Sequence, residues 1–423
     1  MFSIFISLSL ISLSFSQLRF KFTKKPSKYP EQNLIIVPIQ IGTPSQIVPL
    51  SLEFFSNTIW VIDDECGDTV LSKQIPFTPR LSSTYKVKPN EFSKDFLYTF
   101  NTGNHLVKAK QVVDTVNSLP QIDFFVARRF TGLEASSGVL GLDSNNVNFS
   151  SLAFKGFISQ LRDRGVVNKE IFYIKYDDDI KGELVIGEDP SEKKSKIKYY
   201  RKEIENHQWS VKMNSVDYGN NAIEGDVIAN FKIELGVMVG NEFYYNTIKK
   251  NFFNTLISRK KCVEYQIKNT EYSTFKCKDI YKNFPPLSFE FDKELIITFT
   301  YEELFSYDTN DEKIFKVFFS KGKKEEWTLG EPFFKKNILV FDSKNQTIGI
   351  MLLPSSFIDT VLKYKYYIIL PVILISTFLF IVLHYSKRKQ VNQKKTKKAN
   401  GLIPIAEKNT FCTENEEELK EII

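Results

Sequence analysis

The sequence predicts an all-β fold in at least two domains, followed by one C-terminal transmembrane helix. The chain has 423 residues, of which 42% are hydrophobic and 25% charged, so it can bury more than one core. Short runs of β-branched and aromatic residues alternate with Gly, Pro, Asn and Asp turns, as they do in β-sheets. Near the C-terminus, about twenty consecutive residues lack Asp, Glu, Lys and Arg, which is the length that a bilayer core requires.

The two ends of the chain predict a type I membrane topology. Residues 1–16 are apolar and end in small residues, as a secretory signal peptide does. A transmembrane helix is expected over residues 366–385, with a buried soluble helix as the alternative. The tail of residues 386–423 begins with a basic run, which fits the cytosolic side. The body is therefore expected in the secretory or endolysosomal lumen or at the cell surface.

Composition also excludes several classes of function. The formal net charge of +7 comes largely from the basic run after residue 385, so no nucleic-acid-binding surface is expected. The whole chain has three His, which argues against a His-ligated metal centre or a Ser-His-Asp triad. Because the chain also lacks a nucleotide-binding glycine loop, no cofactor is expected.

Periodicity identifies the regular elements of the body. Apolar residues recur at helical spacing over residues 151–164, and Gly165 is expected to end that helix. The other regular segments are short and bounded by turn residues, so they predict strands. The clearest strands cover residues 34–41, 172–176, 182–187, 287–291 and 295–300.

Three of the four cysteines fall in the predicted lumenal body. We expect Cys262 and Cys277 to form a disulfide, because a loop of about fifteen residues closes easily and the bond would contribute about 3 kcal/mol. Cys66 is then either buried or available for an intermolecular bond. Asn148 and Asn345 begin triplets that match the N-glycosylation pattern.

Several short motifs follow one another along the body. In the first half they are I-G-T-P-S-Q from Ile41, I-W-V from Ile59, S-S-T-Y from Ser82, L-Y-T-F-N-T-G from Leu97 and S-G-V-L-G-L from Ser137. In the second half they are residues 209–216, W-T-L-G-E-P-F-F from Trp327 and I-G-I from Ile348. Together these motifs resemble the pepsin family of aspartic proteases. The resemblance implies a bilobal fold with a substrate cleft between two β lobes, expected over residues 33–195 and 196–354.

The loops that should carry the catalysis depart from that family. Its chemistry needs an Asp-Thr-Gly loop from each lobe, because two adjacent carboxyls share a proton and act as acid and base. The resemblance places the first Asp at Glu53, followed by Phe54 and Phe55. The second Asp falls at Lys232, or at Glu234 if the register slips by two. A Glu side chain is longer by one methylene, which exceeds the roughly 0.5 Å tolerance of a catalytic constellation.

Other positions of the site are also affected. Phe100 replaces the flap Tyr, so a hydroxyl is missing there, while Trp60 is expected to support the cleft. If Lys232 faces Glu53, the acid pair becomes an opposite-charge pair that favours both ionised forms. The alternative is that Lys232 is a solvated strand residue.

Residues 17–32 resemble the first strand of a family prosegment, without the inhibitory helix that would follow it. A plain N-terminal strand is the alternative. The leading hypothesis is a membrane-anchored, catalytically inactive homologue that binds a polypeptide in or near its cleft. An active acid endopeptidase that uses Glu53 and Glu234 is the alternative, and an adhesive surface glycoprotein without peptide affinity is a third.

Overall fold

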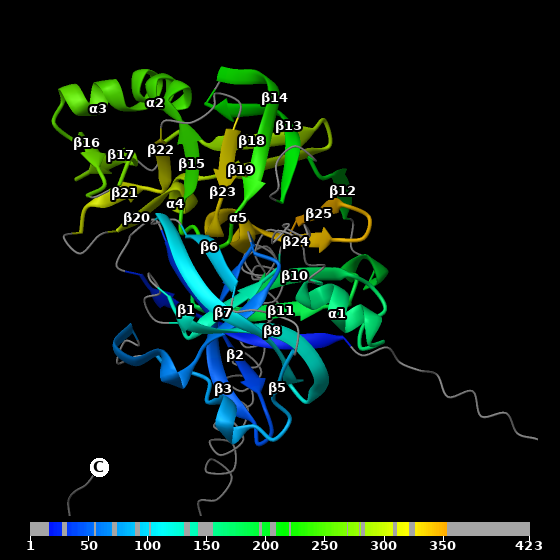
Figure 1. Ribbon diagram of the computed structural model, residues 1–423. Coiled ribbons are helices and arrows are strands. Elements are labelled where there is room, and N and C mark those ends of the chain that lie inside the picture. Colours follow the sequence, from blue (N-terminus) through cyan, green and yellow to red (C-terminus); the bar gives the residue numbers. More distant parts are fainter. Residues whose placement is uncertain are drawn as a thin grey trace, which may run out of the picture. The chain divides into compact units, whose positions relative to one another are not determined.

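The computed structural model shows a mostly β protein with two sheets and few helices (Figure 1). The structure describes residues 17–27, 32–54, 56–69, 74–88, 94–100, 103–130, 136–142, 155–193, 197–203, 209–219, 221–268, 270–278, 280, 284–307, 311–320 and 326–352. All of them belong to one unit, and the second unit, from residue 354 onward, lies outside them. The mostly β architecture predicted from the sequence is therefore confirmed.

The described residues contain no helix that is long and apolar enough to cross a membrane. The predicted signal peptide at residues 1–16 and the predicted span at residues 366–385 both lie outside the described ranges, as does the tail.

The first sheet has fourteen strands among the described residues. In spatial order they are β12 (Lys198–Arg201), β25 (Thr347–Leu352), β24 (Asn337–Asp342), β10 (Ile171–Tyr176), β11 (Lys181–Ile186), β1 (Leu18–Pro26), β2 (Asn33–Ile41), β3 (Gln46–Glu53), β9 (Gly138–Gly141), β4 (Ile59–Ile62), β8 (Leu119–Arg129), β7 (Gly103–Val116) and β5 (Lys86–Val87), with β6 (Lys94–Phe100) paired to β7.

The second sheet has eleven strands in the described part of the chain. In spatial order they are β19 (Leu295–Phe299), β18 (Leu287–Asp292), β13 (Ser210–Tyr218), β14 (Asn221–Phe231), β23 (Glu326–Leu329), β15 (Met238–Asn241), β22 (Val317–Ser320), β17 (Ser273–Cys277), β21 (Lys313–Phe315) and β20 (Phe305–Tyr307), with β16 (Cys262–Gln266) paired to β17.

The helices are short. The α-helices of the described residues are α1 (Phe157–Asp163), α2 (Glu242–Ile248), α3 (Asn254–Ser258), α4 (Tyr301–Leu304) and α5 (Glu331–Lys336). Single turns of other helix types are η1 (Asp64–Thr69), η2 (Pro79–Leu81), η3 (Pro190–Lys193) and η4 (Lys249–Phe253).

The strands predicted from turn-bounded apolar runs are confirmed as β2, β10, β11, β18 and β19. The predicted helix at residues 151–164 is observed as the shorter α1, because its first four residues lie outside the described ranges and residues 155 and 156 precede the helix. Gly165 ends it with a φ of +66°, which a glycine adopts without a steric penalty.

The first sheet draws strands from both halves of the sequence. β24 pairs with β10, and β12 pairs with β25, so strands from the second half of the described residues complete a sheet that begins in the first half. The indole of Trp209 donates a 3.1 Å hydrogen bond to the carbonyl of Leu142, which joins the two halves again. Three strands that begin after residue 195 therefore complete the sheet of the first half.

The N-terminal strand β1 is an interior strand, hydrogen-bonded to β2 on one side and to β11 on the other. Its Phe22 is 2% exposed and lies opposite Gly182, where an added Cβ would come within 2.4 Å of the Phe22 ring. A glycine is therefore needed opposite the ring. The prosegment-like segment is built into the core of the described fold.

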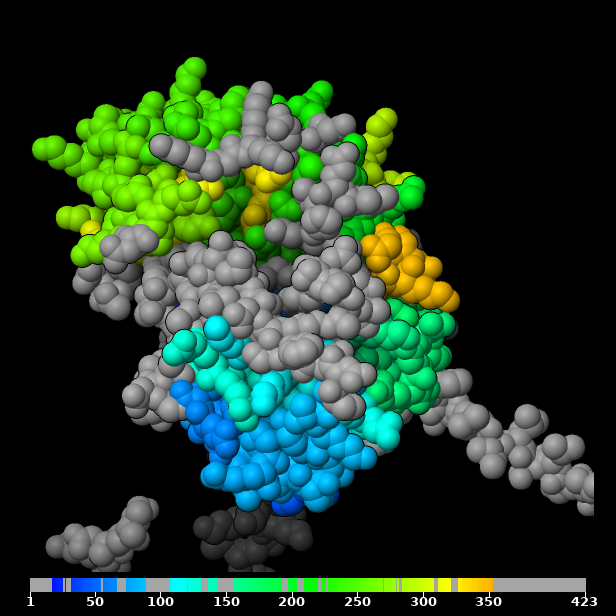
Figure 2. Space-filling view, in the orientation of Figure 1, coloured from blue at the N-terminus to red at the C-terminus, as the bar shows by residue number. Residues whose placement is uncertain are grey.

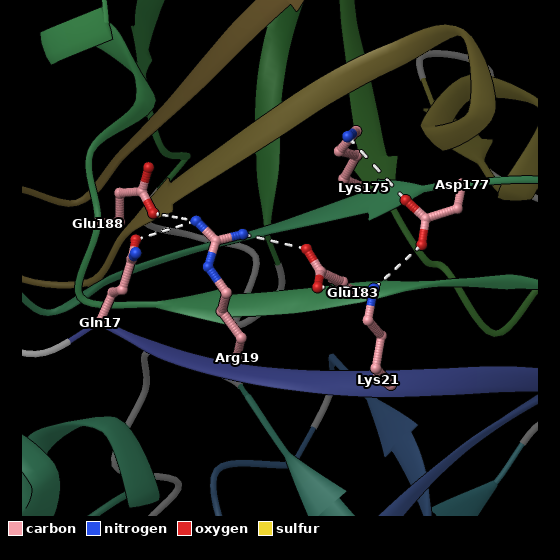
Figure 3. A network of polar contacts seen from close by, with 7 residues as sticks. All are labelled: Gln17, Arg19, Lys21, Lys175, Asp177, Glu183 and Glu188. Carbon is pink, nitrogen blue, oxygen red and sulfur yellow. Dashed lines mark hydrogen bonds and ion pairs between the residues drawn. The ribbon is translucent and has the colours of Figure 1, made fainter.

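The exposed face of β1 carries a network of ion pairs with β10 and β11 (Figure 3). The Arg19 guanidinium lies 3.0 Å from Glu183 and 2.6 Å from Glu188. Lys21 pairs with Glu183 at 2.8 Å and with Asp177 at 3.4 Å. These contacts lower the pKa of Glu183, chiefly through the hydrogen bond from Lys21. Because exposed pairs contribute about 1 kcal/mol or less each, the buried phenylalanines of β1 do more to hold it.

Candidate active site

Backbone pairing relates the first candidate position, Glu53, to a position in the second sheet. Glu53 ends β3 and lies opposite Gly141 of the parallel strand β9. In the second sheet, β14 runs parallel to β23, and the amide of Lys232 donates a 3.1 Å hydrogen bond to Leu329, the residue before Gly330. Glu53 thus pairs with a glycine at the end of β9, and Lys232 lies one residue beyond a parallel pairing that is followed by Gly330.

The contacts of those two glycines show the same offset. A Cβ on Gly141 would lie 2.3 Å from the carbonyl oxygen of Ser56, three residues after the first position. A Cβ on Gly330 would lie 2.2 Å from the carbonyl oxygen of Val237 and 2.4 Å from that of Leu235, which is three residues after Lys232. Only glycine permits so close a backbone approach. Lys232 therefore corresponds to Glu53 in the two sheets.

Glu53 is fully enclosed, with 1% of its surface exposed. One carboxylate oxygen accepts a 3.1 Å hydrogen bond from the hydroxyl of Ser51, and the other has no hydrogen-bond partner within the described ranges. Burial raises the pKa of Glu53 well above its usual value, the negative charge of Glu234 raises it further, and the bond from Ser51 opposes both. Glu53 therefore carries its proton well above the pH at which an exposed glutamate ionises.

Glu234 is the second buried carboxyl, at 2% exposure. No side chain of the described residues donates a hydrogen bond to its carboxylate oxygens, although its backbone carbonyl accepts a 2.8 Å bond from Asn33. Burial raises the pKa of Glu234 to about 7, against a lowering by the positive charge of Lys232. The negative charge of Glu234 in turn raises the pKa of Glu53, so the two carboxyls interact.

The opposite-charge pair considered for Lys232 and Glu53 is not observed. Among the ion pairs of the described residues none joins these two side chains, and the charge that acts on Glu53 is that of Glu234. Lys232 is half-buried and acts on Glu234 instead. The site thus combines two coupled carboxyls with a neighbouring lysine.

Aromatic packing braces the first loop where the family would have a hydroxyl. Phe54 is 2% exposed, and its ring centroid lies 5.6 Å from Phe172, 5.6 Å from Phe334 and 4.9 Å from Phe341. The corresponding residue of the second loop, Ile233, is completely buried. Both loops are therefore fixed by apolar contacts. Phe55 lies outside the described residues.

The other predicted cleft residues lie in the first sheet. Trp60 of β4 is 1% exposed and packs in a small cluster with Phe125 and Phe130. Phe100 ends β6 and pairs with Gly103 of β7, and its side chain is outside the described part. Sequence reasoning missed Ser51, the donor to Glu53. The period of two in a strand could have identified it, because residues two apart share one face.

The predicted disulfide between Cys262 and Cys277 is confirmed, and it joins β16 to β17. Cys66 is buried, and its thiol donates a 2.8 Å hydrogen bond to the carbonyl of Ala127, so it is not presented to a partner chain. A native disulfide indicates an oxidising compartment.

Of the two predicted glycosylation sites, Asn148 lies outside the described residues. Asn345 lies in the exposed turn between β24 and β25, where its side-chain amide donates a 2.7 Å bond to Asp342. No group of three or more metal-ligating side chains occurs in the described ranges.

Comparison with known proteins places this geometry in context. The family model described as eukaryotic aspartyl protease matches residues 35–353. The chain is also 24% identical, over 379 residues, to pregnancy-associated glycoprotein 1 of Bos taurus, with 81% of this chain and 87% of that protein covered. The family match covers both candidate loops and every strand after β2.

Proposed function

The chain belongs to the eukaryotic aspartyl protease family, and we propose that it is a member that binds polypeptides without cleaving them. The observation that carries the proposal is the lysine at the position corresponding to Glu53. Acid–base catalysis of this kind needs a carboxyl at each of the two positions, because one must hold a proton while the other accepts one. The ammonium group of Lys232 has no lone pair with which to accept a proton.

The surroundings of Glu234 support the same conclusion. A catalytic carboxylate is held in place by hydrogen bonds, since small displacements remove most of its effect. In the described part of the chain no side chain holds either oxygen of Glu234, and Glu234 lies two residues beyond the position that Lys232 occupies. Phe54 further fixes the first loop through ring packing.

An acid endopeptidase that uses Glu53 and Glu234 is the second candidate. One observation favours it, namely that the charge of Glu234 acts on the buried carboxyl of Glu53, while the pKa of Glu234 is raised to about 7. A pair of coupled carboxyls with separate pKa values is the arrangement that such catalysis uses.

We also propose that the protein is anchored in a membrane of the secretory or endolysosomal pathway. The apolar stretch of residues 366–385 and the basic residues after it support a single span, and the disulfide between Cys262 and Cys277 supports a lumenal body. Family membership is compatible with both.

Polypeptide binding is tested by incubating the full-length chain, in detergent, with a degenerate library of extended peptides and identifying the peptides that it retains. We expect retention, and we expect it to fall about tenfold or more in the Phe100→Asp variant, which places a charge at the β6–β7 hairpin. Ile296→Asp, at an exposed position on the edge strand β19, is the matched control and should retain peptides normally. A wild-type chain that retains no peptide would contradict the proposal.

A further inference from the structure

A pocket of about 260 Å³ is lined by residues of the first sheet and of the turns that connect its strands. Neither Glu53 nor Glu234 is among the residues that line it. Segments far apart in sequence line it: the residues that follow β4, the turns η1 and η2, the region of β5, and strands β7 and β8. The light-blue segment of residues 74–88, which carries η2 and β5, is exposed on the face seen in Figure 2. None of the pocket residues belongs to the candidate active site.

The backbone that carries the pocket residues is hydrogen-bonded to neighbouring segments. The amide of Asp63 donates a 2.9 Å hydrogen bond to Ala127, and Asp63 forms a β-bridge with Phe77. The ring of Tyr85 packs against buried Phe77 at 6.2 Å. The side chains that line the pocket are therefore carried by fixed backbone.

The acidic side chains of the pocket already have basic partners. Asp64 lies 3.1 Å from Arg80, while Arg128 lies 3.5 Å from Asp63 and 3.4 Å from Glu65. One oxygen of Asp63 also accepts a hydrogen bond from the amide of Glu65. The two guanidinium groups thus offset two of the three negative charges, and Lys110 brings the formal charge of the pocket lining to zero.

Two hydrogen-bond donors of the same pocket have no acceptor among the described residues. Lys110, on β7, makes no ion pair or hydrogen bond with any described residue, and neither does the hydroxyl of Tyr85. Burial and then the negative charge of Asp63 raise the pKa of Tyr85 to about 12, so its hydroxyl keeps its proton and can donate. The side chain of Arg128 is 51% exposed, and among the described residues its guanidinium has two ion pairs, at 3.5 Å and 3.4 Å. The pocket is therefore lined by the ammonium of Lys110, the hydroxyl of Tyr85 and part of the Arg128 guanidinium.

We propose that this pocket binds a small organic carboxylate. The carboxylate would lie against Lys110, Tyr85 and Arg128, because ionised acceptors form the strongest hydrogen bonds with such donors. Pro79 and Val87 supply an apolar wall for a short hydrocarbon body, and the volume exceeds that of a lone inorganic ion. The ligand is either a free acid or the C-terminal residue of a polypeptide. The inference does not depend on what the candidate active site does.

Calorimetric titration of the full-length chain with N-acetyl-leucine tests the proposal. We expect saturable binding that weakens about tenfold or more for N-acetyl-leucinamide, which lacks the negative charge, and for the Lys110→Met variant. Lys110→Arg keeps the charge and should retain binding, while Tyr85→Phe should weaken it. Equal affinity for the acid and the amide, or unchanged binding in Lys110→Met, would overturn the proposal.

Two further titrations define the ligand class. Inorganic phosphate should bind more weakly than N-acetyl-leucine, and equal affinity would contradict an organic-acid site. A peptide with a free C-terminal leucine identifies the source. Tighter binding of the peptide than of N-acetyl-leucine supports a polypeptide C-terminus, and equal binding supports a free acid.

Discussion

The Phe54→Ala variant is expected to lose about 3–5 kcal/mol of unfolding free energy. Phe54 is buried, and its ring meets three other rings, the closest being Phe341 at 4.9 Å. Phe341 in turn packs 5.0 Å from Trp209, so the lost contacts belong to the cluster that joins the two halves of the chain. The change in the urea midpoint at constant slope measures the loss.

Phe243→Ala is the matched control, because Phe243 on α2 is 40% exposed and should lose much less stability. A Phe54→Ala variant as stable as this control would mean that ring packing does not brace the first loop.

The second large effect is a loss of stability as the solution becomes less acidic. The usual pKa of a glutamate is 4.5, whereas that of Glu234 is about 7 in the folded protein. Between these pH values the unfolded chain releases a proton that the folded chain keeps, so the unfolding free energy falls as pH rises. The contribution of Glu234 to this fall is expected to be about 3 kcal/mol. Glu53 adds to the fall, because burial raises its pKa as well.

Urea unfolding at a series of pH values measures this slope. The Glu234→Gln variant should make it shallower, because the amide does not titrate and the contribution of Glu53 remains, and Glu242→Gln, at an exposed position, should leave it unchanged. A slope as steep in Glu234→Gln as in the wild-type chain, or stability that rises between pH 4.5 and about 7, would refute the buried-carboxyl account. Because the pKa values of both glutamates are raised, the two buried carboxyls destabilise the fold least in an acidic compartment.

Most of the fold could be predicted because strand alternation and helical spacing are patterns of residues that are close in sequence. Alternation in β2 and β11, and helical spacing in α1, follow from which side chains face the core. The order of the family motifs along the chain predicted which residues form each of the two lobes. The interior position of β1 was not predicted, because residues 17–27 pair with β11, which begins at Lys181. Pairing between strands so far apart in the sequence leaves no pattern in either segment alone.

The candidate site was predicted in part. The register argument from the motifs gave both Lys232 and Glu234 as alternatives, and backbone pairing with Leu329 distinguishes them. The coupling of Glu53 with Glu234 depends on how deeply each is buried, which one sequence does not give. The carboxylate pocket was missed because separate segments build it.

The most direct test of binding without cleavage is a turnover measurement. The full-length chain is incubated with a degenerate peptide library from acid to neutral pH, beside the Glu53→Gln variant, and the products are analysed by mass spectrometry. We expect peptides to be retained and no fragments to form with either protein. Fragments that form with the wild-type chain and disappear in Glu53→Gln would contradict the account and establish the two glutamates as a working catalytic pair.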